Sequence, residues 1–127
     1  MKALILALLF SANAHAGTIK VHWTHDNKAT DGSTVVLTGF KIYWGLNDAG
    51  NTNVIPLGPP APLAWKVVSG MYYFAKTLSN PLWVPGSQIC LQMTAVADDL
   101  ESNRSGQVCK VMPLDPSAPT VIDIDTP

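Results

Sequence analysis

The sequence predicts an all-β fold, a sandwich of two sheets built from about seven short strands. Apolar and polar residues alternate with a period of two in several segments, a pattern typical of half-buried strands. Turns rich in glycine, proline, aspartate and asparagine separate these segments, and little of the chain favours a helix. Many short strands divided by turn residues in about a hundred residues favour two packed sheets.

The alternation is clearest in residues 18–23, 35–44 and 89–96. Side chains two positions apart in a strand point to the same face, so each of these segments has one apolar face. Less regular strands are expected at 52–57, 64–69, 71–78 and 107–112. The side chains that this pattern assigns to the core are Trp23, Phe40, Ile42, Trp44, Leu91 and Met93.

The composition excludes two classes of protein. The chain has 127 residues, a net charge of −1, 13% charged and 47% hydrophobic residues. That length fits one domain. Nucleic-acid binding needs clustered lysine and arginine, which the sequence lacks, so a nucleic-acid partner is excluded. High apolar content with low net charge also argues against intrinsic disorder.

Residues 1–16 have the organisation of a signal peptide. Lys2 precedes an apolar run over 3–10, and Ala14-His15-Ala16 provides small residues for cleavage after Ala16, with Ala14 as an alternative site. The run is too short to span a bilayer, which needs about 20 residues. No cysteine follows it that could carry a lipid. The sequence therefore predicts a secreted or periplasmic protein without a stable membrane anchor.

Cys90 and Cys109 lie in short apolar segments on either side of a polar turn at 98–106. If the two segments form an antiparallel hairpin, the cysteines lie opposite each other, close enough for a disulfide. Exported proteins meet oxidising conditions, in which such a bond persists. A metal site is the alternative, but the pair lacks the CxxC spacing and histidines of such sites. The sequence therefore favours a structural disulfide.

The order and spacing of several segments resemble a fibronectin type III domain over residues 18–112. The resemblance implies an immunoglobulin-like sandwich, a buried Trp83, and contact with protein or carbohydrate through loops and sheet edges, without catalysis. The expected organisation of the chain is a signal peptide at 1–16, the fibronectin type III-like domain at 17–112 and a proline-rich tail at 113–127. The segments that carry it are Val21-His22-Trp23 and 39–45 (strands B and C), 83–96 (the E–F corner and strand F), and 101–103 with 108–111 (the F–G turn and strand G).

The sequence departs from that pattern in three places. Ile89 replaces the tyrosine that usually follows the corner, and residues 58–62 suggest an insertion in an irregular segment. Because residue 17 almost begins strand B, the first strand is expected to be absent or displaced, leaving an open sheet edge. Residues 120–124 have strand character and could pair with that edge, in the same chain or in another copy. A disordered tail is the alternative.

No motif in the sequence indicates catalysis, a metal or a cofactor. His22 and His25 are interpreted as surface residues rather than metal ligands. The acidic residues Asp98, Asp99 and Glu101 are interpreted as solvated turn residues rather than as a calcium or acid–base site. Asn103-Arg104-Ser105 matches the N-glycosylation sequon, which matters only in a host that attaches such glycans.

Three aromatic residues are the candidates for ligand contact: Trp65, Tyr72 and Tyr73. Tyr72 shares a strand face with Phe74, and Tyr73 takes the other face, so at least one ring should be exposed. An exposed ring can stack on a sugar or anchor a protein, although single exposed aromatics are also ordinary. The sequence thus predicts a binding or structural module. The alternatives are a self-assembling component that uses its tail and, more weakly, an accessory domain of a secreted hydrolase.

Overall fold

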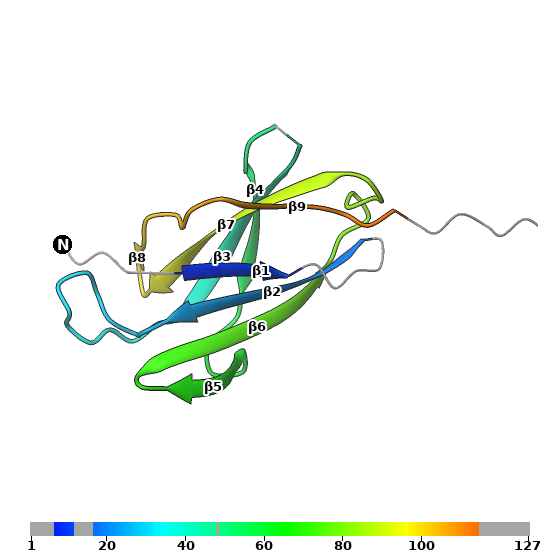
Figure 1. Ribbon diagram of the computed structural model, residues 1–127. Coiled ribbons are helices and arrows are strands. Elements are labelled where there is room, and N and C mark those ends of the chain that lie inside the picture. The colour runs from blue at the N-terminus through cyan, green and yellow to red at the C-terminus, as the bar shows by residue number, and fades with distance from the viewer. Residues whose placement is uncertain (1–6, 12–16, 48, 115–127) are drawn as a thin grey trace, which may run out of the picture.

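The computed structural model describes residues 7–11, 17–47 and 49–114, and of residues 7–11 only the backbone. The described residues form nine strands and no helix (Figure 1). No helix in this part of the chain is long and apolar enough to cross a membrane. The strands are β1 (Ala7–Ser11), β2 (Thr18–His25), β3 (Gly39–Leu46), β4 (Asn53–Leu57), β5 (Ala64–Val68), β6 (Met71–Ser79), β7 (Gln88–Ala97), β8 (Leu100–Glu101) and β9 (Val108–Val111).

The strands form two antiparallel sheets that pack face to face (Figure 1). One sheet has the order β1-β2-β6-β5. The other has the order β4-β3-β7, and both β8 and β9 pair with β7. Each interior strand buries one face, as β2 does with its alternation of buried and half-buried residues. The predicted all-β sandwich is confirmed.

Aromatic side chains fill the space between the sheets. Trp23 stacks on Phe74 with ring centroids 5.6 Å apart, and Phe40 meets Phe74 edge to face at 4.9 Å. At the opposite end of the core Trp44 and Trp83 form an edge-to-face pair at 5.4 Å. Such pairs add to the stabilisation that buried area alone provides. The buried core includes Trp23, Phe40, Ile42, Trp44, Trp83, Leu91 and Met93.

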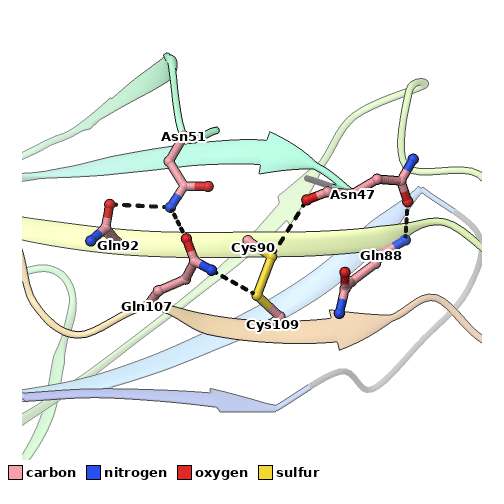
Figure 2. Close-up of a disulfide and its surroundings, with 7 residues drawn as sticks. All are labelled: Asn47, Asn51, Gln88, Cys90, Gln92, Gln107 and Cys109. Atoms are coloured by element: carbon pink, nitrogen blue, oxygen red, sulfur yellow. Dashed lines mark hydrogen bonds between the residues drawn. A yellow bond between two sulfur atoms is a disulfide. The ribbon is translucent and has the colours of Figure 1, made fainter. Parts of the chain in front are cut away.

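A disulfide joins Cys90 of β7 to Cys109 of β9, as the sequence predicts (Figure 2). The two residues are direct partners in the antiparallel ladder. The ladder is interrupted between β8 and β9, where Ser102 and Ser105 continue to donate backbone hydrogen bonds to carbonyl groups of β7. The disulfide therefore holds β9 against β7 after residues 102–107, which belong to no strand.

Two segments differ from their sequence-based expectation. Strand β3 starts at Gly39 rather than at residue 35, because residues 26–37 form a loop closed by the hydrogen bond from Val35 N–H to the Asn27 carbonyl. The proline-rich segment at 58–62 ends in a turn in which the N–H groups of Leu63 and Ala64 donate to the Pro60 carbonyl. This turn leads directly into β5, which a β-bulge interrupts beside Trp65.

A first strand is present and displaced toward the N-terminus, which is one of the two expected outcomes. Strand β1 pairs with β2 from Ala7↔Thr24 to Ser11↔Lys20. It therefore covers the sheet edge that the sequence predicts to be open, and it does so with residues from the predicted signal peptide. Signal-peptide cleavage stays a prediction. The tail segment at 120–124 lies outside the described residues.

Candidate functional site

A pocket of about 700 Å³ opens at one end of the sandwich. The loop at 26–37 forms one wall, and the β5–β6 hairpin with the preceding turn forms the other. This volume is typical of sites that hold a small molecule or a few side chains of a partner. The apolar part of the lining includes Val35, Leu37, Ala64, Val67, Tyr72 and Phe74, and the polar part Asp26, Asn27 and Lys28.

His25 anchors the loop wall of this pocket. Its Nδ1 atom accepts a hydrogen bond of 2.7 Å from the backbone N–H of Asn27, which has a positive φ of 57°. Burial lowers the pKa of His25, although the Asp26 carboxylate opposes this shift. The interpretation of His25 as a surface residue is therefore wrong. Strand β2 continues two residues beyond the clear alternation, so position 25 falls on the core face, whereas His22 faces outward and is half-buried.

One polar atom of the pocket lining has no partner. The side-chain oxygen of Asn27, Oδ1, is buried and accepts no hydrogen bond from the described part of the chain. A buried acceptor without a donor costs about 1–3 kcal/mol. The pocket wall itself is mostly apolar, with Asp26, Asn27 and Lys28 as polar residues at one side.

Exposed apolar side chains surround the pocket. Val36 is 81% exposed, Val67 is 54% exposed, and both belong to the lining. Trp65, Val68 and Met71 are also exposed on the β5–β6 hairpin, but they do not line the pocket. Contiguous apolar surface around a concavity marks interaction sites in soluble proteins. In addition, β5 is the last strand of its sheet, and no strand of the described residues pairs with its outer edge.

The three predicted contact residues are divided between two surfaces. Tyr72 lines the pocket, whereas Trp65 and Tyr73 form an edge-to-face pair at 6.0 Å elsewhere on the hairpin. The ammonium group of Lys66 lies 4.6 Å from the centroid of each ring of that pair. The two rings thus form a cation–π cluster rather than a flat, open stacking surface.

The outer face of the other sheet is a network of polar contacts. Tyr43 donates a hydrogen bond of 2.7 Å to Glu101, Lys41 lies 3.1 Å from the same carboxylate, and the Arg104 guanidinium covers the Tyr43 ring. Burial acts to raise the pKa of Glu101, but the hydrogen bonds from Tyr43 and Lys41 outweigh it and lower that pKa. Burial and the bond to Glu101 raise the pKa of Tyr43. These groups satisfy one another, which indicates a structural role.

Amide side chains continue this network toward the disulfide (Figure 2). The amide of Asn51 donates to the side-chain oxygens of Gln92 and Gln107, and Gln107 in turn donates to the sulfur of Cys109 at 3.3 Å. The Asn47 side chain accepts from the backbone N–H of Gln88. Because each amide already has partners, this face has few groups left for a ligand.

The acidic residues of the turn after β7 do not converge. Asp98 and Asp99 are exposed, and Glu101 is engaged by Tyr43 and Lys41. Within the described ranges, no group of three or more histidine, cysteine, aspartate or glutamate side chains is placed to hold a metal ion. Asn103 of the glycosylation sequon is exposed.

Comparison with known proteins identifies the fold. The structure resembles the third fibronectin III domain of the human KIAA0343 protein with a TM-score of 0.55 and 15% identity, covering 94% of this chain and 90% of that domain. The chain has a fibronectin type III-like fold. No protein-family model matches the sequence, and no curated protein matches it.

Part of a larger protein is also similar in structure to this chain. Astrotactin-2, described as a vertebrate-specific, perforin-like membrane protein involved in neuronal development, matches with a TM-score of 0.60 and 9% identity. The match covers 90% of this chain but only 22% of astrotactin-2. At these identities the likeness shows the fold alone.

Sequence reasoning did not find the pocket, although one signal was present. Val35, Val36 and Leu37 are three consecutive apolar residues in a segment that the pattern extends into strand β3. In the structure they belong to the loop, and all three line the pocket. An apolar run that cannot fit the alternation of the next strand would have indicated a loop with a contact surface.

Proposed function

We propose that this chain is a non-enzymatic, exported binding module that holds a protein partner in the pocket between the 26–37 loop and the β5–β6 hairpin. The observation that carries the proposal is the mostly apolar lining of this pocket, in which Val36 and Val67 are exposed. The partner supplies an apolar side chain, such as the indole of a tryptophan. Fibronectin type III-like folds typically act as binding or structural modules.

A protein partner fits the geometry better than a carbohydrate. A sugar ring needs a flat aromatic face and several polar groups, whereas Trp65 and Tyr73 meet edge to face with Lys66 over both rings. The pocket instead has apolar walls, and the lining side chains Val36 and Val67 are exposed. Interfaces between proteins typically combine such an apolar centre with a polar rim.

Titration of the exported protein with indole, followed by NMR, tests the site. Indole combines an aromatic body with one N–H donor, so we expect shifts confined to residues such as Asn27, Val67 and Tyr72. Val67→Asp introduces a charge into the pocket wall and should abolish these shifts. Val68→Asp is the matched control, because Val68 is 50% exposed, follows Val67 in the same strand and does not line the pocket.

A photo-crosslinking amino acid, p-benzoylphenylalanine, extends the test to the natural partner. Placed at position 67 in the exported protein, it should give a crosslinked protein adduct that is missing when the same group is at position 68. Equal labelling at both positions would contradict the proposed site. Shifts centred on Trp65 and Tyr73 upon titration with maltohexaose would favour the carbohydrate alternative instead.

A further inference from the structure

The strand that completes the first sheet comes from a segment that the sequence predicts to be removed. Strand β1 covers five residues of β2, from Lys20 to Thr24. Cleavage after Ala16 would remove all of β1, and Gly17 immediately precedes β2. No residue of the processed N-terminus then remains to cover this edge. Export would therefore leave the backbone N–H and C=O groups along one side of β2 without partners.

We propose that residues 121–125 of a second copy of this chain replace β1 on that edge after processing. This inference rests on the export proposed above and is independent of the pocket. The segment Val121-Ile122-Asp123-Ile124-Asp125 has the length of β1 and alternates apolar with acidic residues after Val121. An extended peptide that adds to an open sheet edge gains backbone hydrogen bonds along its whole length.

The β1 register shows how the tail segment fits. In that register Leu8 is opposite Trp23, and Phe10 is opposite Val21. Trp23 and Val21 are both buried in the core. An antiparallel tail strand that puts Ile122 and Ile124 in these two positions keeps apolar residues over the core. A shift by one residue would place the aspartates there, where an unpaired charge is costly.

The same register provides charge complementarity on the outer face. It places Asp123 opposite His22 and Asp125 opposite Lys20, the two basic residues of β2 that alternate with its buried positions. Asp125 and Lys20 form a pair of opposite charge, and such a cross-strand pair stabilises antiparallel strands by about 0.2–1 kcal/mol. In β1 the corresponding positions are Leu9 and Ser11, which carry no charge. The tail therefore matches the outer face of β2 better than the strand that it replaces.

The direction of the chain favours a second copy over the chain's own tail. Gly17, which precedes β2, and Met112, which follows β9, both hydrogen-bond to the segment at 80–87. The described part of the chain thus ends, at Leu114, on the side of the sandwich where β2 starts (Figure 1). Folded back on its own domain, it would run parallel to β2, and parallel pairing is slightly less stable. A second copy can approach in the antiparallel direction, and the spacer at 113–119 can extend roughly 20 Å between the two domains.

The test begins with the exported protein, whose N-terminus is first determined by mass spectrometry. Light scattering during gel filtration should then give at least twice the monomer mass for the processed chain. A version that ends at Leu114 should be a monomer. Ile122→Asp should also give a monomer because it puts a charge over the core, whereas the control Thr126→Asp, one residue beyond the paired segment, should associate like the wild type.

A charge exchange tests the register. Lys20→Asp and Asp125→Lys should each raise the dissociation constant about fivefold by creating a pair of like charges, and the double variant should return it to the wild-type value. A processed chain that is monomeric with an intact tail would overturn the proposal, and so would association that persists after truncation at Leu114. A retained N-terminus would overturn it at the earlier step of export, while leaving the indole test of the pocket unaffected.

Discussion

The Nδ1 atom of His25 accepts a hydrogen bond of 2.7 Å from the backbone N–H of Asn27. An atom that accepts a hydrogen bond carries no proton, so the imidazole is neutral, with its proton on Nε2. The ring is buried, and Nε2 has no partner in the described part of the chain. Protonation of Nδ1 would break the contact that fixes Asn27, a residue of the pocket lining, in its left-handed conformation.

The first prediction is a loss of stability as the pH falls. Because burial lowers the pKa of His25 below its ordinary value of 6.5, the unfolded chain binds this proton at a higher pH than the folded chain does. The contribution of neutral His25 to the free energy of unfolding is complete above pH 6.5. It decreases as the pH falls from 6.5 toward the lowered pKa of the folded state. Urea unfolding between pH 8 and 5 should show this decrease.

Two variants separate His25 from other titrating groups. His25→Asn keeps an acceptor near the Nδ1 position but cannot take up a proton, so its stability should vary less over this pH range. His22→Asn is the matched control, because His22 lies on the outer face of the same strand and should leave the wild-type dependence in place. An equal slope for wild type and His25→Asn would contradict the assignment.

Local patterns predicted the sheets well, and the reason is visible in β2 and β7. Alternation with a period of two depends only on neighbouring residues, so it identified the buried faces. The polar turn between two apolar segments then indicated the hairpin that places Cys90 opposite Cys109. The pocket was not predicted, because it forms where the 26–37 loop meets β5 and β6, which are distant in the sequence. Strand β1 was not predicted because an apolar run such as 3–10 fits both a signal peptide and an edge strand.

The second prediction concerns the disulfide between Cys90 and Cys109. The bond closes a loop with a sequence separation of 19 residues. The chain-entropy model gives about 3 kcal/mol of stabilisation for a loop of this size. The double variant Cys90→Ala/Cys109→Ala should lose about that free energy of unfolding, measured by urea denaturation. Dithiothreitol should destabilise the wild type to a similar extent and leave the double variant unchanged, and a wild type insensitive to the reductant would refute the prediction.

The third prediction compares two neighbouring residues after β6. Trp83 is fully buried and meets Trp44 edge to face, so Trp83→Ala leaves a large cavity and should cost about 3–5 kcal/mol of unfolding free energy. Leu82 is 58% exposed, and Leu82→Ala should change the stability by less than about 0.5 kcal/mol. Thermal denaturation of both variants measures the difference. Similar losses of unfolding free energy in the two variants would contradict the prediction that the buried Trp83 side chain accounts for the difference.

The fourth prediction concerns the close approach of two backbone segments at the β3–β4 turn. A Cβ atom at Gly45 would overlap the carbonyl oxygen of Gly50, which belongs to the backbone and cannot rotate away. Gly45→Ala should therefore force β3 and the turn apart and cost about 1–3 kcal/mol. Gly106→Ala is the control, because nothing lies within 4 Å of a Cβ atom there and its φ is not positive.

The position of Gly45 gives the loss a second, local signature. Gly45 pairs with Cys90 in the β3–β7 ladder, so a displaced β3 should also weaken the hydrogen bonds that protect neighbouring amides of β7 from exchange. Hydrogen exchange of Gly45→Ala should thus be faster along β3 and the facing part of β7 than along β2 and β6, which belong to the other sheet. A uniform increase over both sheets would mean that the variant is only globally less stable, and that the close approach to Gly50 does not localise the strain.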